Sequence, residues 1–189
     1  MMNADIRRRT GRLSSRPVVW EALVTGLTLI LVLIPSVHAA EDLGAAPRFT
    51  LETVGGEKLS LDDALAEGPV ILDFWATWCG PCRKALPHMQ ELYEAHHEDG
   101  LTVLAISIDE PRNRPKINST VRSLGLTFPV LVDGDKEVAR LYRVDSVPTT
   151  FIISQAGRVT AYHRGYREGD EKLLAREIRE LLDDERVTP

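Results

Sequence analysis

Alternating apolar and polar stretches along the chain predict a mixed α/β domain. The most continuous apolar run covers residues 70–76 and is interrupted only by Asp73. Such a run is expected of a parallel strand, because a strand of this kind is buried on both faces. Gly68 and Pro69 precede it and mark the entry to the strand. Further strands are predicted at 49–54, 58–61, 101–108, 128–132, 151–154 and 159–163.

Helical periodicity accounts for most of the remaining sequence after residue 60. Residues 81–96 place apolar side chains about 3.6 residues apart, and Gly100 ends the pattern. Pro87 lies inside this helix and is expected to kink it. The last helix is predicted to begin near Asp170, and its buried stripe consists of Leu174, Ile178, Leu181 and Leu182. Shorter helical segments are predicted at 61–65, 115–124 and 136–142, the last with Asp135 as its cap.

The only two cysteines, Cys79 and Cys82, lie where the buried strand meets the long helix. The unpaired N–H groups and the helix dipole at a helix N-terminus lower the pKa of a thiol and favour the reactive thiolate. Pro81 suits the first helical turn, and a separation of three residues places both sulfurs on one face. We predict a dithiol/disulfide redox centre in which Cys79 attacks a substrate disulfide and Cys82 resolves the mixed disulfide.

Two other uses of the cysteine pair are a zinc site and a structural disulfide. Zinc requires four ligands, and there is no third cysteine. The histidines are scattered, at His38, His88, His96, His97 and His163. A disulfide across two residues removes little entropy from the unfolded chain and would stabilise the fold weakly. Redox chemistry is therefore favoured, with the Cys79–Cys82 pair as the redox group and no metal or organic cofactor.

Asp73 is the single charged residue of the buried strand. Burial disfavours the carboxylate, so the pKa of Asp73 should be raised. A carboxyl group of this kind beside the redox centre is a candidate proton acceptor for Cys82. The alternative is a structural carboxyl group that is hydrogen-bonded to a neighbouring side chain.

The string WCGPC at 78–82, together with the strand before it, resembles the active-site segment of the thioredoxin superfamily. The second mark of that family is a cis-proline that faces the disulfide, and Val147-Pro148 matches it ahead of the apolar run 151–153. The resemblance covers roughly residues 47–183. The segment before the first core strand, and the extra length between the two motifs, are similar to the secreted TlpA/ResA-like group.

This resemblance implies a thioredoxin fold, in which a central mixed sheet is flanked by helices. It also implies an N-terminal strand extension and an insertion at about 111–132, before the half that carries the cis-proline. Thioredoxin has an aspartate at the position of Asp73, which supports its role as proton acceptor. The ResA-like branch, which acts in cytochrome c maturation, has a glutamate three residues after its second cysteine, where this chain has Ala85. We therefore do not assign cytochrome c maturation.

Substrate binding is predicted at the residues around the cysteine pair. A cis-proline turns the chain tightly and has no N–H, so the backbone at Val147 can pair with an extended substrate as an added strand would. Trp78 and Pro148 complete the predicted docking surface, although Pro148 in an ordinary trans turn would be only structural. The Gly80-Pro81 pair resembles that of the reducing family members and favours disulfide reduction.

Residues 1–40 have the layout of a secretory signal peptide. Five arginines precede an apolar core of sixteen residues at 22–37, and small or apolar residues at 37–39 offer a cleavage site. A membrane-spanning helix needs about 20 residues, so this apolar core is short for one. The alternative is an uncleaved N-terminal membrane anchor. In either case the domain at 41–189 is expected in an oxidising compartment outside the cytosol, periplasmic or anchored facing the periplasm.

Charge narrows the choice of partners. The chain has 23 basic and 28 acidic residues. The first 40 residues contain five basic and two acidic ones, so the domain from residue 41 has 18 basic and 26 acidic residues. This acidic balance argues against nucleic-acid binding. We expect a monomer that acts on protein disulfides and is re-reduced by a thiol-electron donor in the membrane.

Two other classes of function remain open. Peroxiredoxins share the fold and a similar N-terminal hairpin, but their peroxidatic cysteine lies in a Pro-x-x-x-Thr/Ser-x-x-Cys setting, and residues 75–79 lack that proline. The second class is a binding or chaperone module in which the cysteines are incidental. A variant with both cysteines replaced by serine would still complement a deletion strain in that case.

Overall fold

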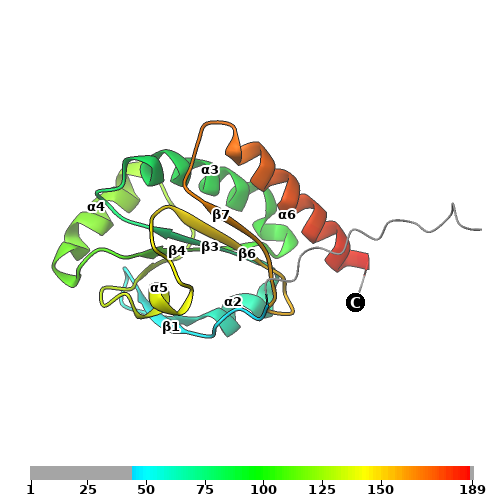
Figure 1. The fold of residues 1–189 in the computed structure, drawn as a ribbon, viewed down its shortest axis with the longest axis horizontal. Helices are drawn as coiled ribbons and strands as arrows, with labels where there is room; N and C mark the ends of the chain where they lie inside the picture. Colours follow the sequence, from blue (N-terminus) through cyan, green and yellow to red (C-terminus); the bar gives the residue numbers. More distant parts are fainter. Residues whose placement is uncertain (1–43, 188–189) are drawn as a thin grey trace, which may run out of the picture. The chain divides into compact units, whose positions relative to one another are not determined.

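The computed structural model describes residues 44–187, which form a seven-stranded mixed sheet with helices on both faces (Figure 1). The strand order is β2-β1-β5-β4-β3-β6-β7. β3, β4 and β5 run parallel, and the remaining neighbours are antiparallel. The strands are β1 (Thr50–Thr53), β2 (Lys58–Ser60), β3 (Val70–Trp75), β4 (Thr102–Ser107), β5 (Val130–Val132), β6 (Thr149–Ile153) and β7 (Val159–Arg164).

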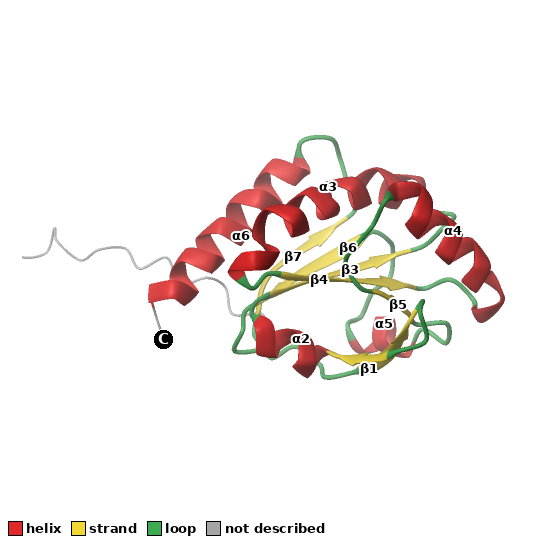
Figure 2. Cartoon of the chain, turned by 180° about the vertical axis from the view of Figure 1, so that it is seen from behind, coloured by secondary structure: helices red, strands yellow, loops and turns green. Residues whose placement is uncertain are grey.

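The helices divide into two layers (Figure 2). α3, α4 and α6 pack on one face of the sheet, and α2 and α5 pack on the other. Their bounds are α2 (Leu61–Glu67), α3 (Gly80–His96), α4 (Arg114–Leu124), α5 (Glu137–Leu141) and α6 (Asp170–Val187), with short 3₁₀ helices η1 (His97–Asp99) and η2 (Pro111–Asn113). The predicted thioredoxin fold, a central mixed sheet flanked by helices, is confirmed.

β3 is buried along its whole length, as predicted. Ile71 and Trp75 pack in the layer below α3, α4 and α6, whereas Leu72 and Phe74 pack in the layer with α2 and α5. Because side chains alternate along a strand, Asp73 lies on the same face as Ile71 and Trp75, which is the face covered by the redox helix α3.

The two additions implied by the family resemblance meet in the sheet. The N-terminal extension forms the β1–β2 hairpin, and residues 111–132 form η2, α4 and β5. β1 pairs with β5 through Glu52 opposite Val132 and Thr53 opposite Leu131. The β1–β2 hairpin therefore continues the sheet beyond β5, the strand that the insertion contributes.

The last helix, α6, begins at Asp170 and buries one side, as predicted. Leu174, Ile178 and Leu182 of α6 are buried, and Leu181 packs at the border of the same apolar cluster. α2 is longer than the predicted single turn, because Ser60 and Asp63 form a capping box that stabilises its first turn.

The predicted cap of α5 is wrong. The helix begins at Glu137, and Asp135 does not cap it. Instead, the buried carboxylate of Asp133 accepts the backbone N–H groups of Val138 and Ala139, at 3.3 and 2.8 Å. Asp135 is the acidic residue closest in sequence, but Lys136 adopts a left-handed conformation that turns the chain back toward Asp133.

Candidate active site

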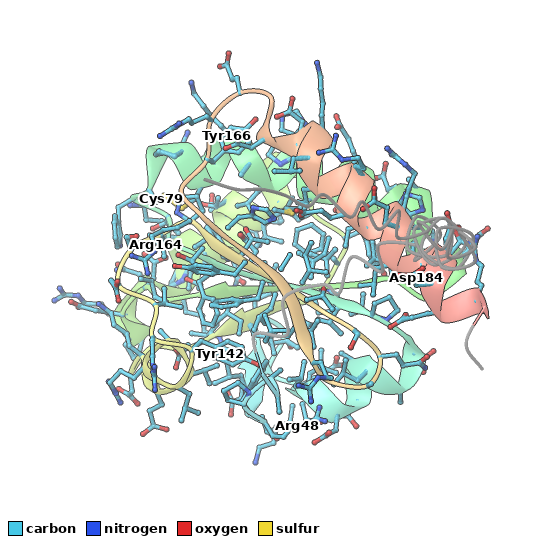
Figure 3. The ribbon with its side chains drawn as sticks, turned by 45° about the vertical axis from the view of Figure 1, so that its right-hand side comes forward. Arg48, Cys79, Tyr142, Arg164, Tyr166 and Asp184 are labelled. Carbon is cyan, nitrogen blue, oxygen red and sulfur yellow. A yellow bond between two sulfur atoms is a disulfide. The ribbon has the colours of Figure 1, made fainter. Side chains whose placement is uncertain are left out.

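Cys79 and Cys82 form a disulfide at the N-terminus of α3, with the sulfurs 2.04 Å apart (Figure 3). Cys79 is the N-cap of the helix, and its Sγ accepts the backbone N–H of Cys82 at 3.1 Å. Gly80 and Pro81 occupy the first turn, as predicted. The helix therefore directs a donor at the Cys79 sulfur, and this electrostatic environment favours a thiolate there in the reduced form.

The two sulfurs differ in exposure. Cys79 is 5% exposed, whereas Cys82 is completely buried. Trp78 stands beside them with 62% of its surface exposed, the largest exposure of any large hydrophobic side chain among residues 44–187. Cys79 is therefore the more accessible of the two cysteines, and the indole of Trp78 next to it is open to contact.

The Val147–Pro148 peptide bond is cis, as the family resemblance implies. The carbonyl oxygen of Val147 lies 3.6 Å from Cys79 Sγ. The sheet causes this proximity, since β6 pairs antiparallel with β3 and places Thr149 opposite Phe74. Pro148 directly precedes β6, so it lies at the end of the sheet where β3 leads into the redox helix.

The carboxyl group of Asp73 has one hydrogen bond within the described residues. The Thr150 hydroxyl donates to Asp73 Oδ1 at 2.7 Å, while the buried Oδ2 has no partner in residues 44–187. On the other side of β3, the residue paired with Asp73 is Ala105, which is apolar. Burial raises the pKa of Asp73 to about 7, and the Thr150 hydrogen bond opposes this shift. The predicted direction of the pKa shift agrees with this environment.

A second carboxylate at the site was not identified from the sequence. Asp109 is buried and accepts the Thr77 N–H at 2.8 Å, the Thr77 hydroxyl at 2.7 Å and the Ser107 hydroxyl at 2.8 Å. These bonds tie the loop before Cys79 to the end of β4. The sequence does contain a signal for this contact, because the polar residues Thr77 and Asp109 follow two successive predicted strands. The carboxyl ends of parallel strands meet at one edge of the sheet.

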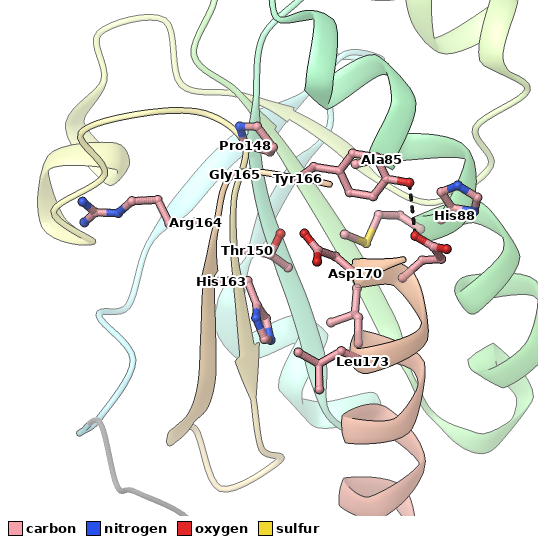
Figure 4. Close-up of a pocket in the computed structure, with 13 residues that line it drawn as sticks. Ala85, His88, Pro148, Thr150, His163, Arg164, Gly165, Tyr166, Asp170 and Leu173 are labelled. Carbon is pink, nitrogen blue, oxygen red and sulfur yellow. Dashed lines mark hydrogen bonds between the residues drawn. The ribbon is translucent and has the colours of Figure 1, made fainter. Parts of the chain in front are cut away.

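Pro148 lies between two hollows beside the site. A groove runs between Pro81 and the Val147-Pro148 bond on one side and the loop 164–167 on the other. A cavity of about 130 Å³ lies deeper, between α3, β7 and α6 (Figure 4). Pro148 borders both hollows, and Ala85 of α3 lines the cavity.

Within residues 44–187, no group of three or more histidine, cysteine, aspartate or glutamate side chains is arranged to bind a metal ion. The same part of the chain contains no helix that is both long and apolar enough to cross a membrane. The predicted signal peptide or anchor at 1–40 lies outside the described residues.

Comparison with known proteins agrees with the fold. The family model described as "AhpC/TSA family" matches residues 44–162. The thiol-disulfide oxidoreductase ResA of Bacillus subtilis is 37% identical over 114 residues, which cover 60% of this chain and 62% of that protein. ResA of Bacillus cereus is 33% identical over 146 residues, covering 76% of this chain and 77% of the relative.

A crystal structure assigned as the thiol:disulfide interchange protein DsbE of Chlorobium tepidum is 31% identical, with a TM-score of 0.70 over 76% of this chain and 99% of that one. The match to the Bacillus subtilis relative covers less than two thirds of that protein. The resemblance to the thioredoxin superfamily and its ResA-like group is confirmed. This chain belongs to the AhpC/TSA family of thioredoxin-fold proteins.

Proposed function

We propose that this protein is a thiol-disulfide oxidoreductase that reduces protein disulfides outside the cytosol. The observation that carries the proposal is the Cys79–Cys82 disulfide, whose outer sulfur caps a helix and lies 3.6 Å from the Val147 carbonyl. Relatives named for thiol-disulfide oxidoreduction and thiol:disulfide interchange support it.

In the proposed reaction the dithiol form is the reductant. The Cys79 thiolate attacks one sulfur of the substrate disulfide, and the other substrate sulfur leaves as a thiolate. The Cys82 thiol then gives its proton to the Asp73 carboxylate and attacks Cys79 Sγ, which releases the second substrate thiolate. The substrate gains two electrons, its thiolates take protons from water, and the protein ends as the disulfide form.

The substrate is proposed to dock as an extended segment along Val147, beside the exposed indole of Trp78. Its reacting sulfur then approaches Cys79 over Gly80 and Pro81. Backbone pairing of this type binds many sequences, because it uses main-chain groups of the partner. It accounts for a reductase with a broad range of protein disulfides.

The cellular setting is proposed from the sequence of residues 1–40. A signal peptide or anchor would bring the domain to the periplasmic side of the membrane, where oxidants are abundant. Turnover there requires a membrane thiol-electron donor that re-reduces the Cys79–Cys82 disulfide. We propose that the protein meets these partners as a monomer.

A thiol peroxidase is the second candidate function, because the matching family model is that of AhpC/TSA proteins. In that case a peroxide would oxidise Cys79 to a sulfenic acid with release of water or alcohol. Cys82 would then form the disulfide and release a second water. Consumption of hydrogen peroxide by the dithiol form, measured beside reduction of insulin, separates the two functions.

Trapping of partners tests the proposed roles of the cysteines. With Cys82→Ser the mixed disulfide on Cys79 is no longer resolved, so this variant should accumulate substrates as reducible complexes on non-reducing gels. Cys79→Ser is the matched control and should trap nothing. Equal trapping by the two variants would contradict the assignment, and failure of the wild-type dithiol to reduce insulin would contradict the proposed activity.

A further inference from the structure

A buried proton acceptor must exchange its proton with water once in every catalytic cycle. Asp73 is completely buried, and the described part of the chain provides a single hydrogen-bond partner for it, the Thr150 hydroxyl at 2.7 Å. The residues paired with Asp73 across the sheet are Thr150 on β6 and Ala105 on β4. Thr150 is therefore the polar one of the two residues paired directly with Asp73.

Thr150 also borders the cavity beside the active site (Figure 4). The cavity measures about 130 Å³, and a single water needs about 10–15 Å³ of such space, so several waters fit. Thr150 is only 5% exposed and lies at the inner end, while the exposed residues Gly165 and Asp170 line the outer end. The cavity thus leads from the one partner of Asp73 to the surface.

The lining of the cavity is largely apolar but includes several polar side chains that can hold water. His88 of α3, His163 of β7 and Glu171 of α6 line it, and Tyr166 covers it. The Tyr166 ring stacks on His88 with 6.1 Å between ring centres, and its hydroxyl donates to Glu171 at 3.2 Å. The other charged residues that line the cavity are Arg164 and Asp170. His163 Nε2 lies 2.6 Å from Glu177 Oε2.

We propose that the Thr150 hydroxyl relays protons between Asp73 and water in this cavity, and that the cavity is the route by which the proton of Cys82 reaches solvent. The inference rests on the proposed function, in which Asp73 accepts that proton. It adds a relay residue, Thr150, and a route that ends beneath Tyr166.

The transfer balances without any co-reactant other than water. The proton of Cys82 moves to the carboxylate of Asp73, whose Oδ2 has no other partner among residues 44–187. A half-turn of the carboxyl group exchanges its two oxygens and brings the acidic proton to face Thr150. Thr150 Oγ1 accepts that proton while its own proton passes to a water in the cavity. Asp73 is then again a carboxylate that accepts a hydrogen bond from Thr150.

The test follows the attack of Cys82 as a separate kinetic step. Reduced protein is mixed with excess 5,5′-dithiobis-(2-nitrobenzoate), whose two successive coloured releases report first the attack of Cys79 and then that of Cys82. Only the second release is independent of reagent concentration. Its rate is measured from pH 5 to pH 9 in wild type, Thr150→Val and Thr150→Ser. Thr160→Val is the matched control, because the Thr160 hydroxyl bonds the Ile152 carbonyl on the neighbouring strand.

Thr150→Val should slow the second release by about tenfold, a part of the effect usual for general acid–base catalysis. It should also move the pH midpoint of this step upward, because the lost hydrogen bond had favoured the carboxylate. Thr150→Ser should restore the rate and the midpoint, while the control matches wild type. An unslowed second release in Thr150→Val would overturn the relay even if the midpoint moved, because the lost hydrogen bond alone shifts the midpoint.

Ala85→Leu provides an independent test of the route. The larger side chain fills the cavity from α3 and leaves the bond between Thr150 and Asp73 intact, so it should slow the second release and not the first. An unchanged second release in both Ala85→Leu and Thr150→Val would overturn the route. Asp73→Asn separates this failure from a wider one: if it slows the second release, Asp73 keeps its proposed role, and if it does not, that role is lost too.

Discussion

Replacement of Asp73 by asparagine should make the oxidised protein more stable at neutral and alkaline pH. The amide has nearly the shape of the carboxyl group, and its oxygen can still accept the Thr150 hydroxyl, which bonds Asp73 Oδ1 at 2.7 Å. What changes is the charge. In the wild type, folding above neutral pH requires an ionised carboxylate to be buried without a basic partner, and the variant removes this requirement.

The magnitude follows from the pKa of Asp73, which burial raises from 3.8 to about 7 in the folded state. The folded state holds the proton of Asp73 more tightly than the unfolded state does. The contribution of Asp73 to the free energy of unfolding is therefore greatest below about pH 4 and falls as the pH rises to about 7. A difference of about three units corresponds to about 4 kcal/mol, at about 1.4 kcal/mol per unit. Above pH 7 the loss is complete and the curve is flat.

The assay is urea unfolding of the oxidised wild-type and Asp73→Asn proteins, followed by tryptophan fluorescence from pH 4 to pH 8. The difference in unfolding free energy between the two proteins should grow by about 4 kcal/mol over this range in favour of the variant. Every other titrating group is common to both proteins and cancels in this difference. Parallel pH curves would refute the argument that Asp73 is forced to ionise in a buried site.

Two further predictions concern stability. Thr77→Val removes the hydroxyl that donates to Asp109 at 2.7 Å, and a lost hydrogen bond to a charged group should destabilise the oxidised protein by about 1.5–3 kcal/mol in urea unfolding; an unchanged midpoint would argue against a structural role for this bond. Gly68→Ala would bring a Cβ within 2.5 Å of the Gly100 carbonyl oxygen, so it should lower the melting temperature more than Gly169→Ala, whose new Cβ meets nothing within 4 Å. Equal losses would mean that the backbone conformation alone, and not the close contact, sets the effect.

Local patterns were sufficient to predict that the cysteine pair follows a buried strand and begins a helix. The apolar run of β3 and the periodicity of α3 depend on the faces that those segments bury, so they are visible in neighbouring residues. The position of Cys79 at the helix start follows from the same local signals. The prediction that Asp135 caps α5 is wrong, because the choice between Asp133 and Asp135 depends on how the chain turns at Lys136 and on which carboxylate is buried.

The partners of the redox pair were decided by tertiary structure. Val147 lies 68 residues from Cys79, Thr150 lies 77 from Asp73, and Asp109 lies 32 from Thr77. The residues around Pro148 could be recognised by their likeness to a family, but no single segment of the sequence indicated Thr150, and Asp109 could be found only by comparing the ends of two strands. Strand register brings such residues together, and register depends on how whole faces of the sheet pack.

The sequence by itself therefore determined the groups on which the proposed chemistry depends: two thiols on one turn of a helix, preceded by a strand with one carboxyl group. Only the tertiary structure decided which groups surround that chemistry, because the pairing of β3 with β6 joins segments that are distant along the chain. The same pairing places a hydroxyl beside the carboxyl group and a cavity beside the hydroxyl. These neighbours arise from the packing of whole strands and helices, which no short stretch of residues encodes.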